Sequence, residues 1–179
     1  KDAILWMNLQ SNYEIDQAKI NEKNKTKLTA IDTWKMIEPF IAIPFLKKQG
    51  IIKGVVLEDL AMLKQVYSIT HFDQLPQKFY EADIARHFRK SEKVTVDKVN
   101  LVAWSQLVQY KAEEIKVAEF DSQSKDELMG ELKDLLRKNK KTSTTTAQLL
   151  AAYGVKLVIQ THPEKCAVDG ISFWSNGKP

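Results

Sequence analysis

Few side chains in this sequence combine the type and spacing that catalysis requires. His71, His87 and His162 are far apart, and no two share the four-residue spacing that places two imidazoles around zinc on one helix face. His162 precedes Cys166 by four residues, but a cysteine nucleophile needs a positioned base and a lowered pKa. From these residues we predict no catalytic site, no metal site and no cofactor in this chain.

The cysteine content also limits the class of protein. Cys166 is the sole cysteine, which excludes a disulfide within the chain and a zinc site built from several thiolates. Such cysteine usage is typical of a reducing cytoplasm. Because no apolar run approaches the ~20 residues that span a bilayer, we expect a cytoplasmic protein with no membrane partner.

A cationic segment between residues 86 and 93 is a candidate for nucleic-acid contacts. It contains Arg86, Arg89, Lys90 and Lys93, within a chain of net charge +4 and pI near 9.0. These side chains either contact an anion such as a DNA phosphate, or belong to a solvated turn between helices, or include an arginine that holds a neighbouring carboxylate. The sequence leaves these interpretations open.

Apolar residues at helical spacing predict a mainly helical chain as far as Gly154, which is expected to end the last helix. Asp97 is the expected N-cap of the most strongly patterned helix. Ser124 and Glu127 are expected to form a capping box at the start of the next one. Trp104, on the Asp97-capped helix, is expected to be a buried anchor.

The N-terminal third is predicted to consist of shorter helices. Ser11 or Asn12 can cap a second helix and so interrupt the first one, and Asp32 can cap a further turn. Pro39 and Pro44 limit helix length beyond that point.

Strand signals appear only after Gly154. Residues 155–160 (VKLVIQ) and 169–174 (DGISFW) are rich in the apolar residues that favour strands. The predicted fold is therefore mainly α, passing into α+β, with a short antiparallel β segment at the C-terminus.

Three stretches resemble HigA-like antitoxins and regulators that carry a helix-turn-helix and a C-terminal ImmA/IrrE-type zincin domain. The first, LWMNLQSNYE, is similar to the closing helix of the helix-turn-helix domain. The second, FRKS at 88–91 with Ala103 and Trp104, resembles the connector of the longer members. The third is similar to the opening β-hairpin of the peptidase-like domain, with Gly154, Val155, Gly170, Trp174, Lys178 and Pro179 in register.

This resemblance implies three parts, namely the tail of a helix-turn-helix domain (1–16), a helical connector (17–142) and the start of an ImmA/IrrE-like domain (143–179). It also implies that the DNA-reading helices precede Lys1 and that a zinc-binding HExxH helix follows Pro179. We therefore expect a part of a longer protein, in which zinc would belong to the intact molecule.

The function that the resemblance implies is transcriptional regulation or antitoxin action in a toxin–antitoxin or stress operon. DNA would be bound through the N-terminal domain, with a cognate toxin or a repressor as protein partner. One alternative is a zinc metallopeptidase that cleaves a repressor. Another is a helical module for dimerisation or partner binding, including a homodimer.

The resemblance also singles out the last strand as a candidate binding edge. In zincins the strand before the metal helix borders the active-site cleft, and its edge pairs with substrate. That position corresponds here to Gly170, Ile171, Ser172, Phe173 and Trp174. The alternatives are a peptide- or partner-binding edge and an ordinary strand paired on both sides.

Overall fold

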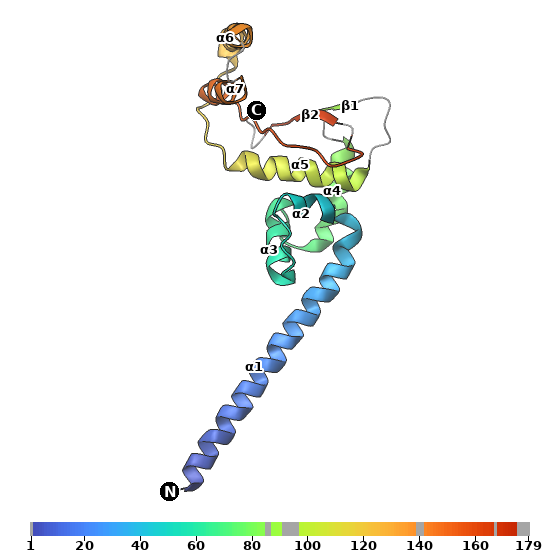
Figure 1. Ribbon diagram of the computed structural model, residues 1–179, viewed down its shortest axis with the longest axis vertical. Helices are drawn as coiled ribbons and strands as arrows, with labels where there is room; N and C mark the ends of the chain where they lie inside the picture. Colours follow the sequence, from blue (N-terminus) through green and yellow to red (C-terminus); the bar gives the residue numbers. More distant parts are fainter. Residues whose placement is uncertain (1, 85–86, 91–96, 139–141, 167, 175–179) are drawn as a thin grey trace. The chain divides into compact units, whose positions relative to one another are not determined.

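The computed structural model (Figure 1) describes residues 2–84, 87–90, 97–138, 142–166 and 168–174, which form mostly helices and one small sheet. The chain forms two compact units, residues 1–64 and residues 65–179. The predicted mainly α fold with a short antiparallel β segment is confirmed. The part boundaries expected after residues 16 and 142 stay predictions.

The first unit begins with α1 (Asp2–Ile37), a continuous helix of 36 residues. The interruption expected at Ser11 or Asn12 is therefore wrong, as is the cap expected at Asp32. A hydrogen bond from Gln10 Nε2 to Glu14 Oε1 (2.9 Å) spans the first of these positions. Such an i to i+4 contact supports the helix across residues that otherwise favour caps.

The hydroxyl groups of three threonines form hydrogen bonds within the same helix. Thr26, Thr29 and Thr33 each donate to the carbonyl oxygen four residues earlier, at 2.8–3.0 Å. These bonds remove the competition that a free hydroxyl offers to the helix backbone. The polar tract between residues 21 and 33 is consequently helical.

The prolines act as the sequence predicts. α1 ends at Ile37, and Pro39 and Pro44 occupy the first turns of the 3-10 helix η1 (Glu38–Phe40) and of α2 (Ile43–Lys48). Their missing N–H groups cost nothing at these positions. Gly50 ends α2 with φ +74°.

A buried aspartate then positions the start of α3 (Val56–Val66). Asp59 is 2% exposed, and its two carboxylate oxygens accept from the backbone N–H groups of Lys53 and Gly54, both at 2.8 Å. The core of this unit contains Ile37, Ile41, Phe45, Leu46, Ile52, Leu60 and Leu63.

The second unit is built around α5 (Lys98–Glu113). Before it come η2 (Phe72–Gln74), α4 (Leu75–Ile84) and β1 (His87–Lys90). The predicted cap is confirmed, because the Asp97 carboxylate accepts from the N–H groups of Val99 (2.9 Å) and Asn100 (3.2 Å). All eight residues from 101 to 108 are buried, so α5 is covered on every side along this stretch.

After α5 the chain continues through η3 (Ser122–Ser124), α6 (Lys125–Lys138) and α7 (Thr142–Ala152), and α6 contacts α7. α6 begins directly after Ser124, and the capping box expected there with Glu127 stays a prediction. The carboxylate of Asp121 caps the preceding η3, accepting from Gln123 N at 2.9 Å and from Ser124 Oγ at 3.2 Å.

Gly154 ends α7 as predicted, and its φ of +79° favours glycine. A second reason is steric: a Cβ at this position would lie 2.6 Å from both the N and the Cα of Phe120. The glycine therefore allows the chain after α7 to cross closely over the segment before α6.

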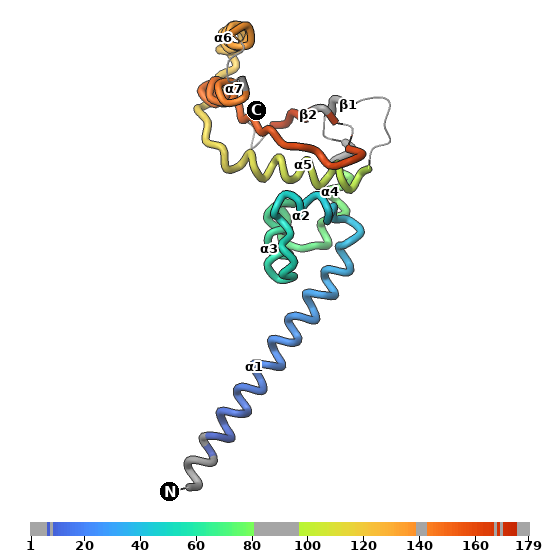
Figure 2. The backbone as a smooth tube through the Cα atoms, viewed as in Figure 1, coloured from blue at the N-terminus to red at the C-terminus, as the bar shows by residue number. Residues whose placement is uncertain are grey.

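The small sheet differs from the sequence-based expectation. β2 (Val168–Ser172) pairs antiparallel with β1, with His87 opposite Ser172 and Arg89 opposite Gly170. Residues 155–160 form no strand, so the hairpin expected between them and 169–174 is absent. The residues before β2, seen in orange to red in Figure 2, instead form an extended segment.

Candidate functional site

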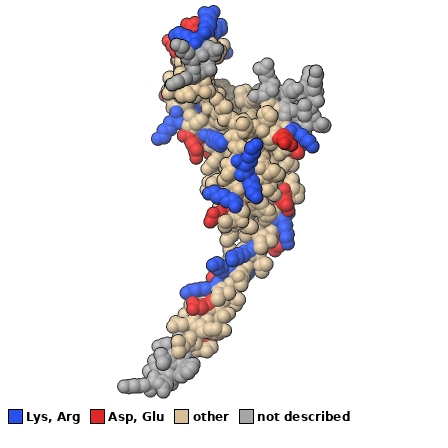
Figure 3. All heavy atoms as spheres, in the orientation of Figure 1, with Lys and Arg blue, Asp and Glu red and all other residues tan. Residues whose placement is uncertain are grey.

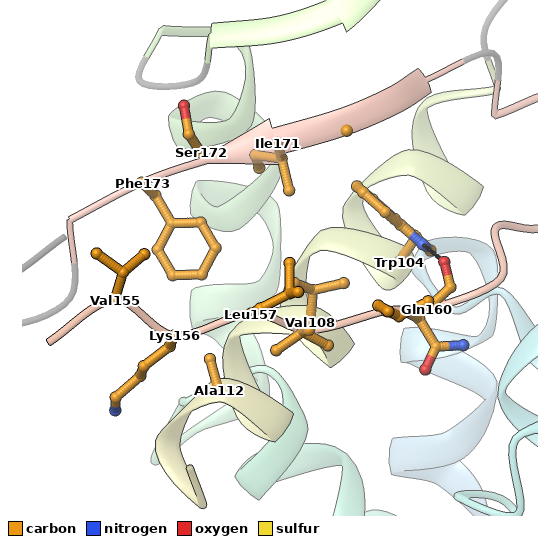
Figure 4. Close-up of a pocket in the computed structure, with 13 residues that line it drawn as sticks. Trp104, Val108, Ala112, Val155, Lys156, Leu157, Gln160, Ile171, Ser172 and Phe173 are labelled. Atoms are coloured by element: carbon orange, nitrogen blue, oxygen red, sulfur yellow. Dashed lines mark hydrogen bonds between the residues drawn. The ribbon is translucent and has the colours of Figure 1, made fainter. Parts of the chain in front are cut away.

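An apolar cavity of about 470 Å³ lies between β2 and the extended segment 155–160. We call it the β2 groove. Its lining comes from α5 (Trp104, Val108, Ala112), from residues 155–160 and from Gly170, Ile171, Ser172 and Phe173. Figure 4 shows Phe173 and Ile171 pointing from β2 toward Val155 and Leu157, whereas Ser172 points away.

The side chains of α5 hold the extended segment in place. Trp104 is 5% exposed, and its Nε1–H donates to the carbonyl oxygen of Gln160 at 3.3 Å (Figure 4). The Lys111 ammonium donates to the side-chain carbonyl oxygen of the same glutamine. Both contacts anchor one end of the segment, while Val155 N bonds to Leu150 O (2.9 Å) at the other.

Between these anchors the backbone is unpaired within the described part of the chain. Residues 156–159 make no hydrogen bond to another backbone group there. Among the described residues β2 likewise has one strand partner, β1. Two extended segments with unused backbone groups therefore border one apolar space.

The volume of the β2 groove is comparable with that of a short extended segment. Strand spacing of about 4.8 Å, a rise of about 3.4 Å per residue and a sheet thickness of about 10 Å give roughly 160 Å³ per strand residue. A cavity of about 470 Å³ thus has room for about three residues of extended chain.

Four of the five residues predicted as a binding edge line this groove. Gly170, Ile171, Ser172 and Phe173 do so, whereas Trp174 is 65% exposed and packs edge-on against Phe120, with ring centroids 5.8 Å apart. Residues 155–160 form the opposite wall, which was not predicted because their apolar composition is typical of a paired strand.

The cationic candidates are only partly described. Arg86 and Lys93 lie outside the described residues. Arg89 and Lys90 belong to β1, opposite Gly170 and Val168. The backbone there is a strand and not the turn that was one of the interpretations, and phosphate binding stays a prediction.

Cys166 is not set up as a nucleophile. It is fully buried, and desolvation together with the Asp97 carboxylate raises its pKa to about 11. The loop before it is tied to the start of α5 by bonds from Asp97 N to Lys165 O (2.9 Å) and from Asn100 Nδ2 to Glu164 O (3.0 Å). His162 is exposed and lies beside its neighbour, with Nδ1 3.1 Å from Pro163 O.

The described residues contain neither a metal-binding cluster nor a membrane-spanning helix. No group of three histidine, cysteine or acidic side chains there could hold a metal ion. No helix in the same residues is long and apolar enough to cross a membrane.

Comparison with family models, curated proteins and solved structures found no match for this chain. The β2 groove must therefore be interpreted from its own geometry and from the resemblance in the sequence.

Proposed function

We propose that this chain is the connector of a HigA-like transcriptional regulator or antitoxin, and that it binds an extended protein segment in the β2 groove. The observation that carries this proposal is that β2, which has one strand partner among the described residues, borders an apolar cavity. Strand addition obtains affinity from backbone hydrogen bonds and selectivity from alternate side chains.

Residues that carry the resemblance to HigA-like regulators line the β2 groove, and this position supports the proposal. Trp104 belongs to the connector motif, whereas Val155 and Gly170 belong to the opening of the peptidase-like domain, and all three line the β2 groove. Sequence features that are far apart along the chain thus meet at one site. The regulatory role of the intact protein would then depend on which segment occupies this site.

The chemistry of the groove defines the ligand. Val108, Leu157 and Ile171 give it apolar walls, so we expect a segment whose alternate residues are small and apolar. The other side chains of such a segment would point away from α5, as Ser172 does in β2.

A titration followed by NMR tests this proposal. The probe is an acetylated and amidated peptide that alternates valine and threonine, and the control is the same peptide with N-methylated valines. We expect the first peptide to shift the amide signals of residues 156–158 and 170–173, and the second to leave them unchanged because it lacks the strand-forming N–H groups.

A matched pair of variants localises the binding. Leu157→Trp fills the groove and should abolish the shifts, whereas Leu136→Trp on α6, where the leucine is 58% exposed, should leave them intact. Binding of the N-methylated peptide with equal affinity, or shifts that persist in Leu157→Trp, would contradict the proposal.

A further inference from the structure

Helix α1 carries an exposed apolar stripe. Leu9, Ile20 and Ile31 follow one another at intervals of 11 residues, which is close to three helical turns and places them on one face. Tyr13 and Leu28 lie beside this line. All five side chains are between 42% and 63% exposed.

Nothing in the described residues covers this stripe. Every side chain from residue 9 to residue 29 is exposed. Helices in water derive most of their stability from packing an apolar face, and isolated ones are marginal. An occupant of the stripe would thus stabilise α1 itself.

The charges along α1 are distributed unevenly between its two halves. Residues 7–18 contain Glu14 and Asp16 and no lysine or arginine, for a net charge of −2. Residues 19–29 contain Glu22 and four lysines, for a net charge of +3, and the lysines are Lys19, Lys23, Lys25 and Lys27. Part of this pattern is visible along α1 in Figure 3.

We propose that α1 pairs with α1 of a second copy of this chain, antiparallel, about a two-fold axis at Ile20. In this register Leu9 lies opposite the partner's Ile31, because each is 11 residues from Ile20. Ile20 lies opposite the partner's Ile20. The overlap of these stripes is about 33 Å long at 1.5 Å per residue.

Charge selects the antiparallel orientation over the parallel one. Parallel helices would place the two acidic halves together and the two basic halves together. The two-fold axis instead brings the same edge of both stripes into contact, which places Asp16 between the partner's Lys23 and the partner's Lys27. The existing ion pair from Asp16 to Lys19 (3.8 Å) is largely exposed and competes only weakly.

The inference is independent of the β2 groove, since no residue of α1 lines that groove. Failure of peptide binding would therefore not contradict the α1 pair. Likewise, a chain that does not dimerise would not contradict peptide binding in the β2 groove.

Sedimentation equilibrium of the whole chain, with Ile20→Glu and Ile15→Glu as paired variants, tests the surface. Ile15 is 48% exposed and Ile20 is 51% exposed, but the two lie about 140° apart around the helix. At about 100 μM we expect a dimer for the unmodified chain and for Ile15→Glu. Ile20→Glu should weaken dimerisation at least tenfold, because two buried carboxylates would meet at the axis.

Charge reversal and cross-linking test the orientation. Asp16→Lys should weaken the dimer at least tenfold, and adding Lys27→Asp should restore it to within a few fold. An oxidised mixture of Leu9→Cys and Ile31→Cys chains should give mainly the mixed disulfide. A monomer at about 100 μM, a dimer indifferent to Ile20→Glu, or cross-linking of Leu9→Cys mainly to itself would overturn the proposal.

Discussion

Replacing Trp104 with alanine removes the side chain on which the extended wall of the β2 groove depends. The indole is 5% exposed, and its Nε1–H holds the carbonyl oxygen of Gln160 at 3.3 Å. The substitution therefore deletes both a large packed ring and the hydrogen bond that anchors one end of residues 155–160.

The expected magnitude comes from these two contributions. Truncating a buried tryptophan costs about 3–5 kcal/mol of unfolding free energy, and a hydrogen bond contributes about 1 kcal/mol of such a loss. Because the ring borders the open β2 groove, water can enter the space it leaves. We therefore expect a loss near the lower end, about 3 kcal/mol.

Urea unfolding followed by far-ultraviolet circular dichroism measures this loss without relying on tryptophan fluorescence. Trp104→Phe should lose about 1–2 kcal/mol, since it keeps most of the ring and loses the donor. Trp174→Ala, a control at an exposed ring with one edge-on contact to Phe120, should lose about 1 kcal/mol or less. A loss below about 1 kcal/mol for Trp104→Ala would refute the reasoning.

Three further substitutions test other parts of the second unit. Gly154→Ala should lose more than about 1 kcal/mol in urea melts, because its Cβ would clash with Phe120 and its φ is positive. Tyr67→Phe should be neutral or stabilising by up to about 1 kcal/mol, because the buried hydroxyl has no partner among the described residues; a clear loss would reveal one. Burial raises the pKa of Cys166 from 9.0 to about 11. The neutral thiol therefore makes its full contribution to the free energy of unfolding below pH 9.0, and this contribution is lost as the pH rises through about 11. Relative to Cys166→Ser, the unmodified chain should lose on the order of 2 kcal/mol over that range, and equal pH profiles would contradict the assignment.

The helix caps and helix breaks could be predicted from the sequence, because each depends on residues within a short stretch of chain. Asp97, Pro39, Pro44 and Gly154 all act as caps or breaks where the sequence placed them. Each of these effects depends on the backbone of the residue itself or of its immediate neighbours. The mainly α fold followed from the same local information.

The errors arose where local signals compete with one another and where contacts over a longer range decide the outcome. Ser11 and Asn12 carry cap signals, but they lie inside a helix that the Gln10–Glu14 bond spans. Residues 155–160 have the composition of a strand, but β2 pairs with β1 instead. Strand composition reports a fit to a half-buried surface and cannot identify the partner strand.

The candidate site was predictable in part for the same reason. Four of the five residues that the resemblance singled out as a binding edge line the β2 groove. The opposite wall depends on the bond from Trp104 to Gln160, which joins residues 56 positions apart. No local pattern encodes that contact.

The central claim is that the second edge of β2 is free to accept an extended segment. Amide hydrogen exchange of residues 156–159 and 170–173, measured with and without the alternating valine–threonine peptide, tests it most directly. We predict that in the free protein the amides directed into the β2 groove exchange quickly, while those bonded to β1 are protected. The peptide should slow exchange at the groove-facing amides by at least tenfold. Full protection of all these amides in the free protein would show that the edge is already closed and would contradict the account.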